Sequence, residues 1–162
     1  FYIRMRNNFE DKINKDPMYK NVSVVDLSSK LADPGSIDAV LTFRNLHNWI
    51  GPQIDIIFSN SHKALKKGGV LGIVEHRADP GTSLEEMKKT GYVTEEYAIE
   101  TAKKHGFTLI AKSEINANPK DTKNYTRGVW TLPPVLRLKE QDKETYLNIG
   151  ESDRMTLLFR KL

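Results

Sequence analysis

The chain has 162 residues, which is enough for one domain with a single sizeable core. Its residues are 38% hydrophobic and 28% charged, and no apolar run approaches the roughly 20 residues that a membrane-spanning helix needs. The net charge of +4 is spread over interleaved positive and negative residues, which is typical of a solvated surface rather than of a nucleic-acid-binding face. We therefore expect neither a membrane nor a nucleic acid among its partners.

The N-terminal stretch predicts a helix followed by a strand. Apolar residues recur at every fourth position over residues 1–15, which predicts an amphipathic helix that Asp16-Pro17 ends. The apolar run that follows predicts a strand over 22–27. Residues 28–36 are a turn-rich connection.

The central part of the chain, residues 37–77, predicts a strand, a helix and a second strand. Two short apolar runs at 37–43 and 70–75 flank an amphipathic helix from Pro52 to about Lys67, and this order implies a parallel sheet. Both runs end in charged or amide residues. Because ligands bind at the carboxyl ends of the strands in open α/β sheets, we expect a polar site at that edge.

The remaining elements are predicted from capping residues and from alternation of apolar and polar positions. A polar segment at 116–134 contains no clear element, and loops longer than about 15 residues are often functional. The predicted elements are a short helix at 84–89, a helix between Thr94 and Gly106, a strand at 107–113, a helix turn at 140–148 and a last strand at 155–161.

Several strings in the chain resemble class I S-adenosylmethionine-dependent methyltransferases. The general features are Val-Val-Asp-Leu at 24–27, shortly before Ile-Asp-Ala-Val-Leu at 37–41, and Leu-Lys-Lys-Gly-Gly-Val-Leu at 65–71 before a strand. Four longer strings resemble one bacterial family of predicted methyltransferases, and they are distributed over residues 41–157. They are Leu-Thr-Phe-Arg-Asn-Leu-His-Asn-Trp (41–49), Gly-Val-Leu-Gly-Ile-Val-Glu-His-Arg (69–77), Ser-Glu-Ile-Asn-Ala-Asn-Pro-Lys-Asp (113–121) and Gly-Glu-Ser-Asp-Arg-Met-Thr-Leu (150–157).

The resemblance implies a Rossmann-like α/β fold in one domain over residues 1–162, with a mostly parallel sheet and an antiparallel last strand. It also implies S-adenosylmethionine as cofactor, an unidentified small-molecule acceptor and a cytoplasmic location, and it leaves a homodimer and an N-terminal signal open. Two alternatives stay open. One is a non-catalytic nucleotide-binding or interaction module with a degenerate methyltransferase fold, and the other is a different nucleotide-binding α/β protein such as a dehydrogenase, which the strings suit less well.

The chain departs from the family pattern at its start. In the family, a glycine-rich turn and an acidic strand end hold the methionine and ribose parts of the cofactor, and both would precede Phe1. The chain begins without Met. We therefore expect it to be the C-terminal part of such an enzyme, to bind the cofactor weakly and to be inactive alone.

Four residues are candidates for cofactor binding by resemblance. Asp26 corresponds to the residue that accepts a hydrogen bond from the adenine amino group, and Leu27 to the residue against the ring. Phe43 and Asn45 follow the next strand, where the family places the sulfonium and the substrate. The alternative for Asp26 is a turn-capping role before Ser28.

Three residues are candidates for catalysis. His47 is the first choice of general base, because an imidazole can take a proton near neutral pH, and His76 leaves the next strand. Arg44 can hold an acidic substrate group with a forked pair of hydrogen bonds. Alternatively, Arg44 is a structural residue paired with Glu75, and each histidine has a packing role.

Four more residues are candidates for substrate contact, namely Asn48, Trp49, Glu75 and Arg77. The alternative for residues 75–77 is a salt-bridged strand exit without a chemical role. The chain has four histidines and no cysteine, and neither a His-x-x-x-His motif nor a carboxylate cluster occurs at ligand spacing. We therefore predict no metal site.

Overall fold

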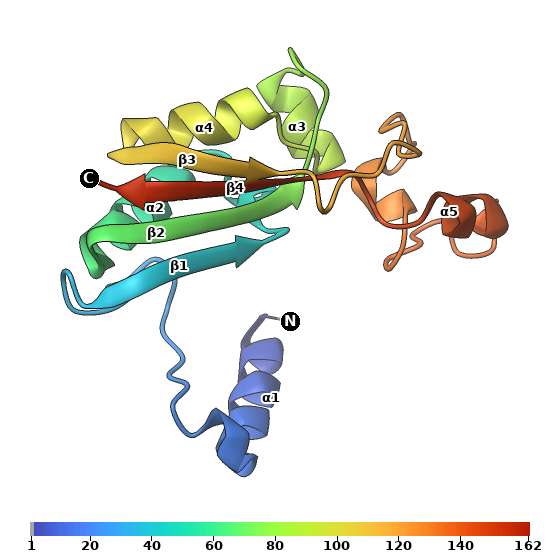
Figure 1. Ribbon diagram of the computed structural model, residues 1–162. Helices are drawn as coiled ribbons and strands as arrows, with labels where there is room; N and C mark the ends of the chain where they lie inside the picture. Colours follow the sequence, from blue (N-terminus) through green and yellow to red (C-terminus); the bar gives the residue numbers. More distant parts are fainter. Residues whose placement is uncertain (1) are drawn as a thin grey trace.

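Four strands form one mixed sheet in the computed structural model, which describes residues 2–162. The strand order is β1-β2-β4-β3 (Figure 1). β1 and β2 are parallel, whereas β4 is antiparallel to both of its neighbours. The strand bounds are β1 Ile37–Phe43, β2 Leu65–His76, β3 Phe107–Ser113 and β4 Arg154–Lys161.

The pairing confirms part of the predicted topology and corrects another part. The last strand is antiparallel, as expected. The expectation of a mostly parallel sheet is wrong, because only one of the strand pairs is parallel. The cause is the position of β4, which lies between β2 and β3 and so replaces one parallel pairing with two antiparallel ones.

The predicted strand over 22–27 does not form, and this expectation is wrong. The backbone around it makes turn-type hydrogen bonds, from Val22 N to Tyr19 O at 2.8 Å and from Ser29 N to Asp26 O at 3.1 Å. None of the described strands pairs with this segment. A strand is stabilised by its ladder with a neighbour, so its apolar pattern alone does not hold an extended segment in a sheet.

The β1-α2-β2 unit forms as predicted, with α2 at Pro52–Ala64. The helix was expected to end at about Lys67 but ends three residues earlier, at Ala64. The reason is that β2 already begins at Leu65, which pairs with Ile37 at the start of β1. The two parallel strands end at the same edge of the sheet, so the chain segments that follow Phe43 and His76 come together there.

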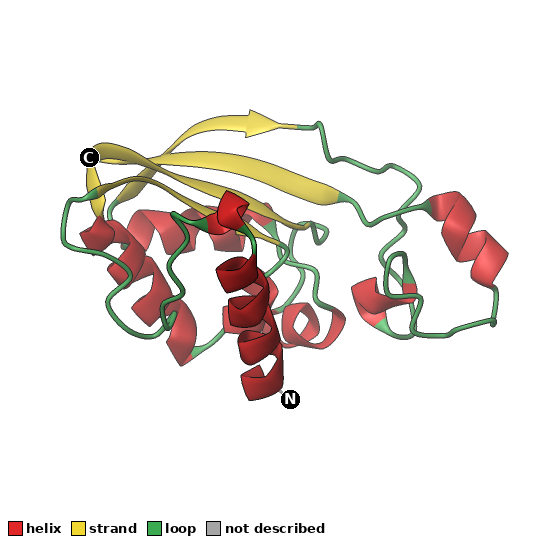
Figure 2. Cartoon of the chain, turned by 90° about the horizontal axis from the view of Figure 1, so that it is seen from below, coloured by secondary structure: helices red, strands yellow, loops and turns green. Residues whose placement is uncertain are grey.

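The hydrophobic core lies between the sheet and the helices on one of its faces (Figure 2). Leu71, Ile73, Leu157 and Phe159 alternate along β2 and β4 and are almost completely buried against this helical layer. The helices that pack there are α2, α3 (Leu84–Thr90) and α4 (Glu95–Lys104).

The remaining helices were predicted within a few residues. Thr94 caps α4, since its Oγ1 accepts a hydrogen bond from Tyr97 N at 3.1 Å, and α5 occupies Lys143–Ile149. The N-terminal helix α1 spans Tyr2–Lys15 and lies apart from the sheet (Figure 1). Among the described residues, no helix has the length and apolar character that a bilayer crossing requires.

Candidate functional site

The chain segments after β1 and β2 open into a pocket of about 320 Å³, which we call the histidine pocket. Its polar wall comes from the two strand ends and consists of Arg44, His47, Asn48 and His76. Its apolar wall comes from the long segment that sequence analysis left without structure, and includes Trp130 and Pro133-Pro134. The polar residues expected at this edge of the sheet therefore line a pocket.

His47 is held in place by a carboxylate beneath the pocket. Its ring Nδ1 lies 3.0 Å from Glu75 Oε1, and its backbone N–H donates to Glu75 Oε2 at 3.0 Å. The Glu75 side chain is completely buried. With Nδ1 on the carboxylate, Nε2 is the remaining ring nitrogen, and a carboxylate that orients an imidazole in this way is also found at general-base histidines.

His76 contributes a second imidazole to the same cluster. Its Nδ1 lies 2.6 Å from Ser152 Oγ, and its Nε2 lies 4.0 Å from Glu75 Oε1. Burial lowers the pKa of His76 to about 4, although Glu75 opposes the change. At neutral pH His76 is therefore an uncharged imidazole, and one of its two ring nitrogens can accept a hydrogen bond or bind a metal.

Arg44 lies beside these histidines and has a partly exposed side chain. The Arg44 N–H continues the ladder by donating to Val74 O at 2.7 Å, and its φ of 53° turns the chain away from the sheet. Its side chain is 42% exposed, and its nearest carboxylate is Glu151 at 3.9 Å. The structural alternative, a pair with Glu75, does not form, because His47 occupies that carboxylate.

The apolar wall is fixed by a close approach of two backbones. Gly128 packs against Thr90 at the end of α3, and a Cβ on Gly128 would lie 2.2 Å from Thr90 O. This contact sets the short 3-10 helix Gly128–Thr131, and with it Trp130, whose ring lies edge-on to His47 at 5.9 Å. Trp130 and Ser152 were not among the residues expected at this site, and their only signals in the sequence were the length of the 116–134 segment and the string at 150–157.

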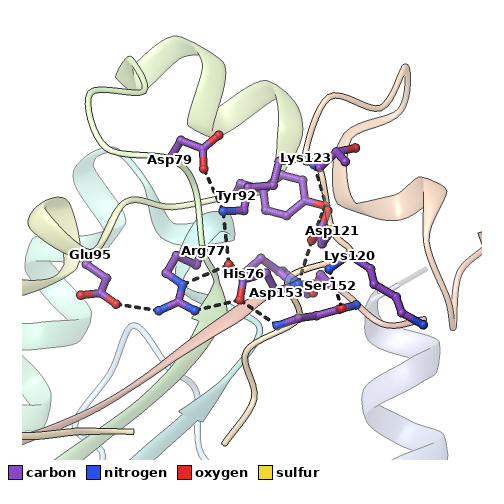
Figure 3. A network of polar contacts seen from close by, with 12 residues as sticks. His76, Arg77, Asp79, Tyr92, Glu95, Lys120, Asp121, Lys123, Ser152 and Asp153 are labelled. Carbon is purple, nitrogen blue, oxygen red and sulfur yellow. Dashed lines mark hydrogen bonds and ion pairs between the residues drawn. The ribbon is translucent and has the colours of Figure 1, made fainter. Parts of the chain in front are cut away.

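Arg77 does not line the histidine pocket, and the structure places it in an ion-pair network instead (Figure 3). Its guanidinium donates to Asp153 at 2.8 and 3.1 Å, to Glu114 at 2.8 and 3.0 Å and to Glu95 at 3.1 Å. Hydrogen bonds from Arg77 to Asp153 are the main reason that the pKa of Arg77 is raised. For this residue, the salt-bridged alternative describes the structure better than substrate contact.

A second pocket, of about 280 Å³, lies beside the free edge of β1, and we call it the apolar pocket. Three of the predicted cofactor residues line it, namely Leu27, Phe43 and Asn45. Trp49, which was expected on the substrate side, also lies here. Phe43 lines both the apolar pocket and the histidine pocket, so the two are neighbours.

Asp26, the fourth predicted cofactor residue, lines a smaller adjoining pocket of about 170 Å³ together with Leu27 and Trp49. Its Oδ1 accepts hydrogen bonds from the Ser28 hydroxyl and the Ser28 N–H, and these bonds lower the pKa of Asp26. Asp26 thus caps a turn, as the alternative stated, and its role in cofactor binding stays a prediction.

Comparison with known proteins identifies the fold but no closer relative. Neither a family model nor a curated protein matches the chain. Among solved structures, it is similar to S-adenosylmethionine-dependent methyltransferases, and this class shares its fold. One, from Methanosarcina mazei, is 14% identical over 86% of this chain and 66% of its own, with a TM-score of 0.55. Another, from Archaeoglobus fulgidus, is 14% identical over 86% of this chain and 67% of its own, with a TM-score of 0.53.

A third similar structure has the same fold with a different named chemistry. It is the cyclase SpnF, which is 17% identical over 86% of this chain and 56% of its own, with a TM-score of 0.58. The chain thus spans less than two thirds of the length of SpnF and of the Methanosarcina protein. The similarity establishes the α/β methyltransferase fold, and the activity has to be argued from the site.

Proposed function

We propose that the protein is an S-adenosylmethionine-dependent methyltransferase that acts on a small-molecule acceptor. The observation that carries the proposal is the shared position of Phe43, which lines both the apolar pocket and the histidine pocket. Methyl transfer requires a donor and an acceptor that meet in line, and alignment of the two provides much of the rate acceleration. Two adjoining pockets at the carboxyl end of a strand meet this requirement.

The apolar pocket and its neighbour fit the adenine side of the cofactor. Leu27 and Trp49 offer apolar surface for a ring, and Asp26 offers a carboxylate oxygen for an amino group. S-adenosylmethionine, when bound, supplies an electrophilic methyl group and leaves as the neutral thioether. In this proposal Phe43 and Asn45 lie where the two ligands meet.

The histidine pocket is the acceptor side in this proposal. Arg44, whose side chain is 42% exposed and whose guanidinium makes only a long contact of 3.9 Å with Glu151, binds an anionic group of the acceptor. His47, oriented by Glu75, takes the proton that the acceptor's nucleophilic atom loses as its bond to the methyl group forms. Asn48 and Trp130 position the acceptor.

We further propose that the protein belongs to the bacterial family of predicted methyltransferases that the four long strings resemble. The support is the strings themselves, because they supply residues of both pockets, including Phe43, His47 and His76. The alternative, a non-catalytic module, predicts that the cofactor pocket is retained but that no methyl group is transferred.

Calorimetric binding of S-adenosylhomocysteine to the protein encoded by the complete gene tests the proposal. Asp26→Ala should weaken binding about 5- to 30-fold, because one hydrogen bond to the ligand is lost. Arg44→Ala should leave this affinity unchanged. The Arg44→Ala variant should instead transfer less methyl group than wild type when acidic small molecules are screened with labelled S-adenosylmethionine.

Asp33→Ala is the matched control, because Asp33 is an exposed carboxylate of the same connection and pairs with Lys30. It should leave the affinity unchanged. Equal effects of the Asp26 and Asp33 variants, or a loss of S-adenosylhomocysteine binding in Arg44→Ala, would contradict the assignment of the two pockets. Binding without transfer to any acceptor would favour the non-catalytic alternative.

A further inference from the structure

Glu75 is a buried carboxylate without a permanent cation beside it. Its side chain has no exposed surface, and its hydrogen-bond partners are the backbone N–H groups of His47 and His76 and the His47 ring. Within residues 2–162, the ion-pair contacts of Glu75 are with these two imidazoles and with neither a lysine nor an arginine. Buried carboxylates are normally paired with a cation or bind a metal, so the charge of Glu75 lacks a usual partner.

The same three residues form a set of potential metal ligands. Each offers one ligand atom, and these atoms lie within 4.8 Å of one another. Glu75 Oε1 is 3.0 Å from His47 Nδ1 and 4.0 Å from His76 Nε2. Two ligands on one tetrahedral zinc ion are about 3.3 Å apart, given bonds of about 2.0–2.1 Å. The two distances lie on either side of this spacing, and an ion among the three atoms would replace the proton between His47 and Glu75.

The surroundings support the ligands as a metal site requires. His76 Nδ1 is held by Ser152 Oγ at 2.6 Å, which fixes the ring and leaves Nε2 for a metal. Glu75 is oriented by two backbone N–H groups, at 2.8 and 3.0 Å. Both histidines line the histidine pocket, so a coordination position remains open on the pocket side, as in catalytic rather than structural sites.

We propose that His47, Glu75 and His76 bind one divalent transition-metal ion of the zinc type at the floor of the histidine pocket. Two nitrogen ligands and one carboxylate favour such an ion over magnesium or calcium, which prefer oxygen ligands throughout. The sequence conceals the site, because 28 residues separate His47 from Glu75. Ligand-spacing motifs therefore cannot detect it.

This inference goes beyond the proposed methyl transfer, and its test needs neither cofactor nor acceptor. It bears on the role of His47, because a neutral imidazole that binds a metal through Nδ1 carries its proton on Nε2, the nitrogen that would otherwise act as the base. An ion held by His47, Glu75 and His76 would instead supply Lewis acidity at the histidine pocket, where it would lower the pKa of a hydroxyl group bound to it. Metal binding and base action by His47 are thus exclusive.

Equilibrium dialysis against zinc chloride, with metal counted per chain, measures the site directly. We expect one ion per wild-type chain, a tetrahedral absorption spectrum when Co²⁺ replaces Zn²⁺, and a higher melting temperature with added Zn²⁺. Outer ligands typically contribute 10- to 100-fold in affinity, so loss of a direct ligand in His76→Asn or Glu75→Gln should weaken binding about 100-fold or more.

His62→Asn is the matched control, because it removes an imidazole that lies against Phe107, outside the cluster. It should leave zinc affinity unchanged. The proposal is overturned if wild type binds no zinc in a one-to-one ratio, or if His62→Asn weakens binding as much as His76→Asn. If Glu75→Gln does not fold, the wild-type stoichiometry and the His76 variant decide the question.

Discussion

Asp153 connects the end of β2 to the segment that carries the apolar wall of the histidine pocket. Its carboxylate accepts hydrogen bonds from Arg77 at 2.8 and 3.1 Å and from Asn118 N at 3.0 Å, and Lys123 Nζ lies 3.2 Å away (Figure 3). Asp153→Asn keeps the size of the side chain but removes its negative charge. We expect this variant to be clearly less stable than wild type.

The size of the effect follows from burial and from the partners that stay. The Asp153 side chain is 9% exposed and that of Arg77 18%, and breaking a buried pair of this kind costs about 3–5 kcal/mol. Arg77 keeps Glu95 and Glu114, so we expect a smaller loss, about 2–3 kcal/mol. For a domain of this size, that lowers the melting temperature by about 4–12 °C.

The loss should also depend on pH. Burial raises the pKa of Asp153, but the hydrogen bonds from Arg77, Asn118 and Lys123 outweigh it, and the net pKa is below the ordinary value. Because the folded-state pKa is the lower one, this stabilisation is complete above the unfolded value of about 4 and is lost as the pH falls through the folded-state pKa. Urea unfolding of both proteins at pH 7 and pH 3 should show a difference that shrinks in acid.

Glu140→Gln serves as the control, because Glu140 forms an exposed pair with Lys143. It should unfold like wild type at both values of pH. The reasoning is refuted if Asp153→Asn unfolds at the same urea concentration as wild type at pH 7, or if its deficit is equally large at pH 3.

Two further substitutions test the support of the pocket, each by thermal melting. Gly128→Ala should lower the free energy of unfolding by about 2–5 kcal/mol, because the backbone at φ +54° is left-handed and the new Cβ clashes with Thr90 O. Gly81→Ala is the control: its φ is +80° but the space around it is open, so the loss should be only about 1–2 kcal/mol. Equal losses for the two variants would refute the proposed clash. Tyr92→Phe should lower the free energy of unfolding by about 1.5–3 kcal/mol, because the buried Tyr92 hydroxyl donates a hydrogen bond to the Asp121 carboxylate at 3.0 Å. An unchanged melting temperature would show that this hydrogen bond does not stabilise the fold.

Much of the fold could be predicted because its signals act over a few residues. Pro52 at the start of α2, the Thr94 cap of α4 and the alternation along β4 each have a local physical cause, and each element formed within a few residues of its expected place. The carboxyl ends of β1 and β2 were correctly expected to meet, because parallel strands of one βαβ unit must end at the same edge.

The parts of the fold that could not be predicted depended on contacts between residues far apart in the sequence. Residues 22–27 have the composition of a strand, but none of the strands that the structure describes pairs with them. Arg77 meets Asp153 across 76 positions of sequence.

The sequence alone determined the helices, the four strands that form and the identity of the polar residues at the strand ends. Only the tertiary structure decided that His47, Glu75 and His76 form one cluster and that Trp130 lies against His47 in the same pocket. The reason is that periodicity and capping are properties of a segment, whereas a site is a property of side chains that folding brings together.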